Sequence, residues 1–192
     1  MTDYYVSEKG RDRNTGSSPD SPWRSIQKGL NELKAGDTLN IMEGTYDPPG
    51  EDADYWSLDN KKGSADKKIT IKNYNNEEVT LTGLEQGTRG GYPQTGLRKQ
   101  DTGYYWTYTG LLEINHCSHV VVDGLNIVDT TGIAVHIRGS SSEGQTKPEA
   151  PKSKFTSTDI LVKNCRMHNA RNRTVFIQNT WDVTVQDCET SY

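Results

Sequence analysis

Three segments in the second half of the chain share one pattern of apolar and polar positions. Each reads apolar, any residue, apolar, polar, and each then places Gly124, Asn164 or Asp187 before a small or apolar residue. Period-two alternation predicts a half-buried β-strand, and glycine, asparagine and aspartate tolerate left-handed backbone dihedrals. The pattern therefore predicts strands that end in a sharp one-residue bend and repeat as the rungs of a solenoid. The segments are residues 120–127, 160–167 and 183–189.

Other segments extend this repeat into three lines of strands that can be laid side by side. In the second line, Gly83 takes the place that Gly124, Asn164 and Asp187 take after the later strands. Three short strands per coil, with one tight turn and two variable turns, predict an all-β fold, a single-stranded parallel β-helix of about four coils. The first line holds residues 69–72, 111–114, 134–137 and 174–177; the second holds 79–82, 120–123, 160–163 and 183–186; the third holds 125–128, 165–168 and 188–191.

A short amphipathic helix precedes the solenoid. Ser21 is placed as its N-cap and Pro22 as its first residue, and Lys34 and Gly36 mark its end, so we expect a helix over about 22–34. Its apolar face could cover the first coil, which has no neighbour on that side. We therefore expect one domain over 1–192, with an N-terminal cap over 1–46 and coils over 69–192. Long loops are expected over 84–110 and 139–159.

The last expected strand brings the chain to Tyr192 in the third line of the fourth coil, in mid-coil. An uncovered last coil would present an open apolar edge that invites association. We therefore expect a fragment of a longer β-helix, or a chain completed at this end by self-association or by a partner chain.

Composition narrows the class of partner. The net charge of −4 argues against nonspecific nucleic-acid binding, and no apolar run approaches the length of a membrane span. The three cysteines resemble neither a disulfide framework nor a metal set. Cys165 and Cys188 occupy equivalent inward positions on neighbouring coils, so a buried stack is the main expectation and a disulfide a minor alternative.

Six segments carry a resemblance to known proteins: YYVS at 4–7, SPWRSIQK at 21–28, AGDT at 35–38, EGTY at 43–46, KITIK at 68–72 and VTLTG at 79–83. With these segments the chain resembles, over most of its length, secreted right-handed parallel β-helix proteins, among them polysaccharide lyases acting on pectate, alginate and chondroitin-type chains. The resemblance implies a right-handed coil, a secreted or cell-surface protein and polysaccharide lyase chemistry. No signal peptide is visible after Met1, so either the chain is intracellular or its export signal lies outside this sequence. The catalytic and metal-binding residues of those lyases lie on later coils, so none is transferred here. Ca²⁺ in the complete protein is compatible with the resemblance, but no cofactor or metal ligand is assigned.

Strand alternation selects the side chains of the first line that face away from the core. The outward residues are Lys72, Glu113, His136, Arg138, Phe176 and Gln178. Two arginines and four loop aromatics flank this line, and aromatic rings suit stacking on sugar faces. These flanking residues are Arg171, Arg173, Tyr104, Tyr105, Trp106 and Tyr108.

For an acidic polysaccharide or glycan, these residues fit β-elimination at a uronic acid. Arg138 or Arg173 would neutralise the sugar carboxylate, and His136 would remove the adjacent proton. The remaining outward and flanking residues are the candidates for substrate binding. Hydrolysis needs two carboxylates about 5–9.5 Å apart, and Glu113 is the only one that the sequence places on this line. A noncatalytic glycan-binding, adhesin or tailspike-type β-helix and an ordinary solvated charged face remain open alternatives.

Overall fold

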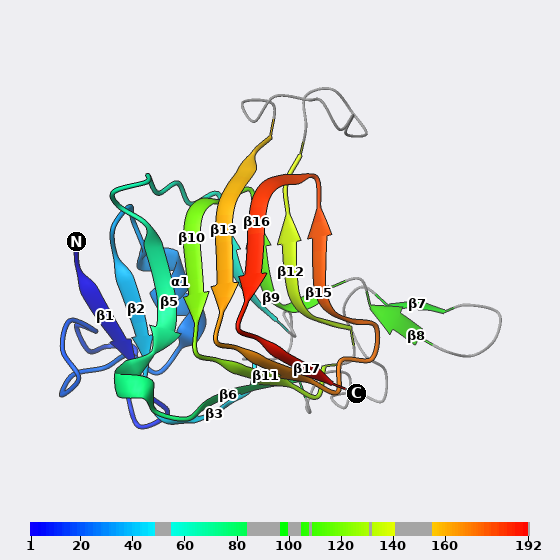
Figure 1. Ribbon diagram of the computed structural model, residues 1–192. Coiled ribbons are helices and arrows are strands. Elements are labelled where there is room, and N and C mark those ends of the chain that lie inside the picture. Colours follow the sequence, from blue (N-terminus) through cyan, green and yellow to red (C-terminus); the bar gives the residue numbers. More distant parts are fainter. Residues whose placement is uncertain are drawn as a thin grey trace.

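The computed structural model describes residues 1–48, 55–83, 109–130, 132–140 and 155–191, and the backbone alone of residues 97–99 and 105–107. Most of the described strands belong to three parallel sheets (Figure 1). Sheet A contains β1 (Asp3–Val6), β2 (Thr38–Ile41), β5 (Ile69–Asn73), β10 (Ser118–Asp123), β13 (Ser157–Lys163) and β16 (Thr180–Gln186). Sheet B contains β3 (Gly44–Tyr46), β6 (Val79–Thr82), β11 (Asn126–Val128), β14 (Arg166–His168) and β17 (Glu189–Ser191). Sheet C contains β4 (Trp56–Asp59), β9 (Gly110–Asn115), β12 (Ile133–Arg138) and β15 (Arg173–Gln178).

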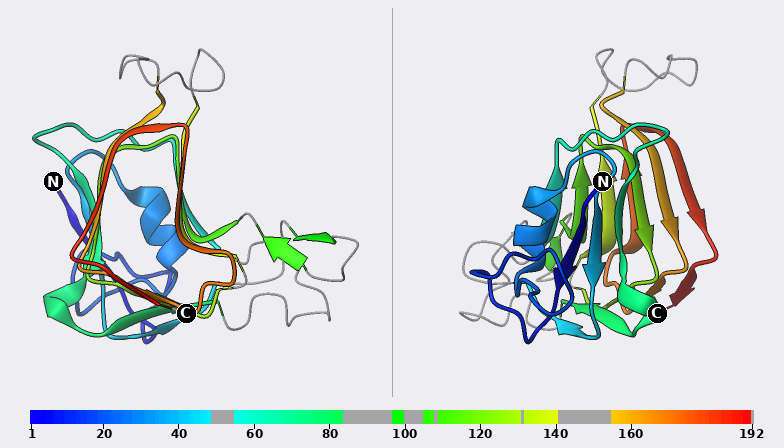
Figure 2. Two further views of the ribbon diagram at one scale, coloured as in Figure 1. Left: turned by 45° about the vertical axis from the view of Figure 1, so that its right-hand side comes forward. Right: turned by 90° about the vertical axis from the view of Figure 1, so that its left-hand side faces the viewer.

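The chain visits the three sheets in a fixed order from β4 onward. It passes from sheet C to sheet A to sheet B and then returns to sheet C, one position further along each sheet. Viewed along the stack, successive coils superpose around a common interior (Figure 2). Each strand inside a sheet is therefore hydrogen-bonded to its equivalents in the coils before and after it, and each edge strand to one of them. The winding confirms the predicted parallel β-strand solenoid. A separate antiparallel pair is formed by β7 (Leu97–Lys99) and β8 (Tyr105–Thr107).

The predicted alignment of the first coil was wrong. Residues 69–72 belong to β5 in sheet A, where Ile69 is in register with Val120, and residues 79–82 belong to β6 in sheet B. The strand of this coil that lies in sheet C is β4, which precedes the region over 69–192 where the coils were expected. Alternation alone does not distinguish the three sheets. The usual one-residue bend is also replaced here by a longer link that contains the 3₁₀ turn η1 (Tyr74–Asn76).

The one-residue bends between sheets A and B are present in the later coils. Gly124, Asn164 and Asp187 have φ values of 72°, 53° and 51°. The Asn164 side-chain amide donates to Asp123 Oδ1 at 2.7 Å, which ties one bend to the previous coil. Gly83 does not share this role, because it follows the sheet B strand β6. Asparagine, aspartate or histidine occupies every left-handed position that is not glycine in the described part of the chain.

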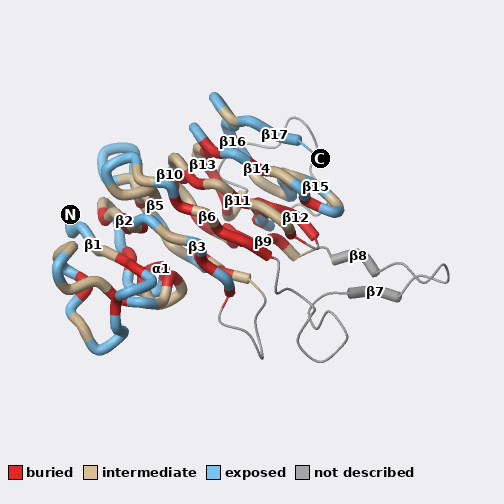
Figure 3. The backbone as a smooth tube through the Cα atoms, turned by 90° about the horizontal axis from the view of Figure 1, so that it is seen from below, coloured by how far each residue is buried: buried red, intermediate tan, exposed pale blue. Residues whose placement is uncertain are grey.

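Inward-facing apolar residues are buried along the stack up to the last described coil, whose residues are partly or fully exposed (Figure 3). Leu58, Leu112 and Ile114 of sheet C are fully or almost fully buried. Leu125, Cys165 and Cys188 follow the left-handed bends in successive coils. Both cysteines are free thiols, so the disulfide alternative is wrong; Cys165 is buried as predicted, whereas Cys188, in the last described coil, is only partly buried.

Helix α1 (Ile26–Glu32) is shorter than predicted. Its N-cap is Ser25, whose hydroxyl accepts a hydrogen bond from the Lys28 backbone amide at 3.2 Å. The expected N-cap Ser21 lies outside the helix because Trp23 continues the edge of sheet A, forming a parallel bridge with Val6. The helix buries Ile26 and Leu30 and contacts β1, β2 and β4, the first strands of the stack (Figure 2).

Candidate functional site

The outer face of sheet C carries two rows of side chains that run across neighbouring coils. We call the two rows together the sheet C strip. Strand register places the members of each row directly opposite one another, and residues two apart on a strand share a face. The inner row is Ser57, Glu113, His136 and Phe176, and the outer row is Asp59, Asn115, Arg138 and Gln178. The inner-row and outer-row residues of one strand are two positions apart, which is about 6.6 Å along the strand.

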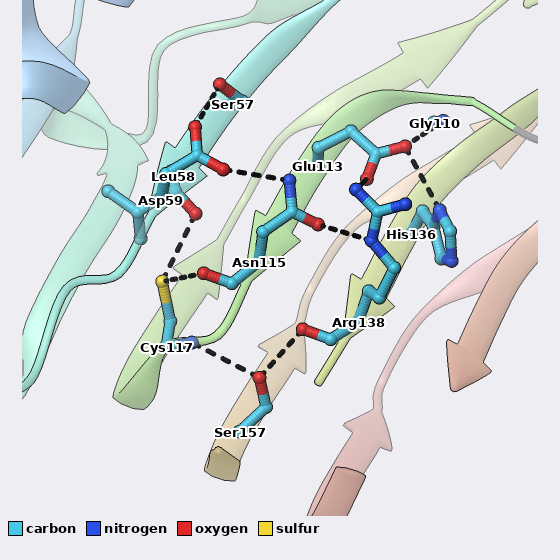
Figure 4. Close-up of polar contacts among 10 residues, drawn as sticks. All are labelled: Ser57, Leu58, Asp59, Gly110, Glu113, Asn115, Cys117, His136, Arg138 and Ser157. Carbon is cyan, nitrogen blue, oxygen red and sulfur yellow. Dashed lines mark hydrogen bonds and ion pairs between the residues drawn. The ribbon is translucent and has the colours of Figure 1, made fainter. Parts of the chain in front are cut away.

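The centre of the inner row is a buried pair of ionisable side chains. Glu113 and His136 are only 3% and 2% exposed. Glu113 Oε1 accepts a hydrogen bond from His136 Nδ1 at 3.0 Å and a second from the Gly110 backbone amide at 2.5 Å (Figure 4). An ionised carboxylate only accepts hydrogen bonds, so Nδ1 carries the imidazole proton. The lone pair of neutral His136 is then on Nε2.

Two atoms of this pair have no hydrogen-bond partner in the part of the chain that the structure describes. Among the described residues, none bonds to His136 Nε2 or Glu113 Oε2, and both atoms are buried. A buried polar atom without a partner costs about 1–3 kcal/mol, so most native sites avoid one. Arg138 Nη2 lies 4.0 Å from Glu113 Oε2. These two atoms make the pair a candidate for chemistry as well as for structure.

Residues of the two neighbouring strands pack closely against His136. Phe176 stacks on it with ring centroids 5.1 Å apart and an angle of 17° between the planes. On the preceding strand, a Cβ atom added to Gly110 would lie 2.7 Å from His136 Cβ, so the close approach of β9 requires glycine there. The Arg173 guanidinium lies 4.5 Å from the centroid of the Phe176 ring, in a cation–π contact. At this end of the inner row, the His136 imidazole, the Phe176 ring and the Arg173 guanidinium therefore follow one another in contact.

The outer row forms a continuous line of hydrogen bonds across three coils. Ser57 Oγ donates to Asp59 Oδ2 at 2.5 Å, and Asn115 Nδ2 donates to Asp59 Oδ1 at 2.9 Å. Asn115 Oδ1 in turn accepts from Arg138 Nε at 3.2 Å (Figure 4). The Arg138 side chain is 48% exposed. The outer row therefore holds the Arg138 side chain by a hydrogen bond and leaves it half exposed to solvent beside the buried His136.

The structure brings some of the sequence-predicted residues together and excludes others. Glu113, His136, Arg138, Phe176 and Gln178 all lie on the sheet C strip, with Arg173 beside it. The expectation that the inner row faces solvent was wrong for Glu113 and His136. Both project from the outer face, but the close approach of Gly110 and the stacked Phe176 help to bury them.

Lys72 was wrongly placed on this face. It belongs to β5 in sheet A, in register with Asp123. Arg171 is exposed at the link that leads into β15. Tyr104 and Tyr108, and the side chains of Tyr105 and Trp106, lie outside the described residues.

Three polar residues of the strip were missed by the sequence prediction: Ser57, Asp59 and Asn115. The missing strand β4 had a usable signal, because Trp56 and Leu58 alternate with Ser57 and Asp59. Asp59 is exposed on the same face as Glu113. The statement that Glu113 is the only carboxylate on this line was therefore wrong.

Two long segments of the chain that lie outside the three sheets border the strip in the sequence. One precedes β9 and the other follows β12. The ends of the second excursion are joined. Ser140 N donates to Thr156 Oγ1 at 2.7 Å, and Thr156 N donates to Ser140 O at 2.9 Å. His116 Nδ1 lies 2.8 Å from the same Thr156 hydroxyl. The excursion therefore leaves and rejoins the coil at a closed base.

A second polar cluster lies in sheet A. Asp159 accepts from His119 Nδ1 at 2.6 Å and from Lys68 Nζ at 3.2 Å. Burial alone would raise the pKa of Asp159, but these two hydrogen bonds and the nearby charges outweigh it and lower the pKa below its ordinary value. All three side chains are partly exposed, as expected for a structural ion-pair network. Within the described ranges, no group of three or more His, Cys, Asp or Glu side chains could hold a metal ion.

No protein-family model matches the sequence. The uncharacterized protein YwoF of Bacillus subtilis (strain 168) is 30% identical over 163 residues, which are 81% of this chain and 30% of YwoF. The GH136 lacto-N-biosidase of Eubacterium ramulus superposes with a TM-score of 0.69 at 16% identity, over 99% of this chain and 34% of that one. Pectate lyase Pel9A superposes with a TM-score of 0.66 at 15% identity, over 96% of this chain and 38% of that one.

The chain is a parallel β-helix that resembles polysaccharide lyases in its fold. It spans only about a third of the length of each of these three proteins. The similarity at this low identity establishes fold, so the reaction must be argued from the site. In the described part of the chain, no helix is long and apolar enough to cross a membrane.

Proposed function

We propose that this chain belongs to a carbohydrate-directed β-helix protein that cleaves an acidic polysaccharide by β-elimination, with the sheet C strip as its site. One observation supports this most. β12 places His136, with its Nε2 lone pair unbonded among the described residues, and Arg138, a half-exposed cation, two residues apart on one face. A base and a cation at that spacing match a uronic acid, whose acidic C–H bond is adjacent to its carboxylate.

The proposed step assigns each residue a separate task. Arg138 binds the sugar carboxylate and stabilises the charge that develops when the adjacent C–H bond breaks. His136 Nε2 takes that proton, and Glu113 stabilises the resulting imidazolium through Nδ1. The electron pair of the C–H bond forms the new C=C bond, and the glycosidic C–O bond breaks. The departing oxygen takes a proton from water, so the products are an unsaturated sugar end and a hydroxyl end.

The test is incubation with pectate, alginate and chondroitin sulfate while the absorbance of unsaturated products is followed. We expect product from at least one of them, and we expect His136→Gln and Arg138→Ala each to reduce its rate by at least about a hundredfold, the lower end of what general acid–base catalysis contributes. Asn169→Gly serves as the control. It removes a hydrogen bond of 2.9 Å from Asn169 to Asp129, two residues that are not part of the sheet C strip, at a bend where φ of Asn169 is 54°. Full turnover in both strip variants would rule out this assignment.

A binding-only function is the second candidate, and the burial of His136 favours it. At 2% exposure, the imidazole is not open to a substrate in this conformation, whereas Arg138 is. In that case the protein retains glycans without forming unsaturated ends. The addition of Asp59 to the strip also makes a hydrolase worth testing. New reducing ends without unsaturation would identify hydrolysis and exclude elimination.

Finer features of the fold are proposals of the same kind. We infer that α1 caps the first coil, since its buried face contacts β1, β2 and β4, that the coil is right-handed, and that the protein acts in a secreted or cell-surface setting. Replacement of Leu30 by Asp should expose this end and promote unfolding. A wild-type melting temperature in that variant would contradict the capping role.

Association through the last described coil also stays a prediction. Ile177 and Val185 of this coil are apolar and are 45% and 39% exposed. We expect a concentration-dependent mass in sedimentation experiments. A single monomer mass at all concentrations would contradict it.

A further inference from the structure

We infer that Asp59 and Asn115 are positioning residues that aim the Arg138 guanidinium at a sugar carboxylate, so that the sheet C strip selects uronate sugars over their neutral esters. This inference rests on the proposed site, but it concerns substrate selection and does not require turnover. The residues involved come from three successive strands of sheet C, β4, β9 and β12, and share one register position.

The direction of each hydrogen bond in the outer row is determined by chemistry. The Asp59 carboxylate can only accept, so the Asn115 amide must present its NH₂ group to it. The carbonyl oxygen of Asn115 must then face β12, where Arg138 Nε, which can only donate, occupies the other side. Ser57 holds the second oxygen of Asp59. The amide of Asn115 therefore has one allowed orientation, and the line of bonds has one direction.

Asn115 binds Nε of Arg138, the guanidinium nitrogen that a carboxylate ligand does not need. Nε is bonded to Asn115, whereas the two terminal nitrogens make no hydrogen bond with the described residues, and Glu113 Oε2 is 4.0 Å from Nη2. The two terminal nitrogens are the edge with which arginine binds a planar carboxylate through two parallel hydrogen bonds. Asn115 also acts as a neutral spacer. A carboxylate at its position would pair with Arg138 directly and occupy the fork.

The chemical class of ligand follows from this geometry. A half-exposed guanidinium with a fixed plane recognises a carboxylate by shape and charge. A methyl-esterified carboxyl group has no charge and offers fewer acceptors. The strip should therefore distinguish pectate from highly methyl-esterified pectin, which share one sugar backbone.

The test measures the affinity of the intact chain for these two polymers by calorimetry. We expect pectate to bind more tightly than pectin, and Arg138→Ala to abolish the difference. Asn115→Asp has the same size as the native side chain, and we expect it to weaken pectate binding by about tenfold with little change for pectin, because the new carboxylate pairs with Arg138. Asn115→Ala should weaken pectate binding less, and Asn169→Gly should leave the ratio of affinities unchanged.

The outcomes separate this inference from the proposed reaction. Loss of the preference in Asn115→Asp supports the inference even if no unsaturated product is ever formed. A preference that is lost in Arg138→Ala but intact in Asn115→Asp overturns the positioning role and leaves the cation assigned. Equal binding of pectate and pectin by the wild-type chain overturns the inference outright. Adding Asn115→Asp to Arg138→Ala should cause no further loss, and a further loss would show that Asn115 acts independently of the arginine.

Discussion

Replacing Glu113 by leucine should destabilise the protein by an amount that the structure determines. Oε1 accepts two buried hydrogen bonds, from Gly110 N and His136 Nδ1. Leucine removes the acceptor and leaves both donors unpaired, at about 1–3 kcal/mol each. We therefore expect the free energy of unfolding to fall by about 2–6 kcal/mol, a large share of the stability of a typical domain.

A second substitution tests the cause of this loss. Glu113→Leu combined with His136→Phe removes one of the two unpaired donors and keeps a ring stacked on Phe176. The double variant should be more stable than Glu113→Leu alone by about 1–3 kcal/mol, because only Gly110 N remains without a partner.

Urea unfolding followed by tryptophan fluorescence measures all three proteins, and an unchanged m-value shows that the same surface is exposed on unfolding. The reasoning is refuted if the double variant is no more stable than the single one.

Three further predictions concern other parts of the molecule. Asp159→Asn should lower stability at neutral pH. The difference from wild type should disappear as the pH falls below about 4 and through the lowered pKa of Asp159, because protonation removes the stabilisation of the native state. Urea titrations across this pH range measure the difference, and a constant difference would contradict the pKa shift. Asn164→Val should cost about 1–2 kcal/mol because φ is 53° there, whereas Asn164→Gly should cost less; thermal unfolding compares them, and equal losses would contradict the backbone argument. Iodoacetamide should label the half-buried Cys188 first, since burial raises the pKa of Cys117 to about 11 and of Cys165 to about 12; mass spectrometry of timed digests shows the order, and early labelling of Cys165 would contradict it.

The solenoid could be predicted because its cause is local. Alternation and a left-handed residue such as Asn164 specify a strand and a bend without reference to the rest of the fold. The alignment of the first coil could not be predicted this way. Its link between β5 and β6 is longer than the later bends, and alternation does not show which of the three sheets a strand joins.

The site was only partly predictable for a different reason. Alternation correctly assigned His136 to the outer face, but its burial depends on Gly110 and Phe176, which come from neighbouring coils. The role of Asn115 depends in the same way on Asp59, which lies 56 residues earlier in the chain. Contacts between coils depend on which strands are neighbours, and the pattern placed the strands of the first coil in the wrong sheets.

The closed base formed by Ser140 and Thr156 has a consequence for how such a protein can diversify. Because the two hydrogen bonds between these residues complete the coil, the excursion they delimit can be exchanged without disturbing the strands on either side. Loop-closure entropy increases slowly, by about 0.6 kcal/mol for each doubling of length. Transplanting a segment from another β-helix at these two residues is therefore a practical route to a new specificity on an unchanged scaffold.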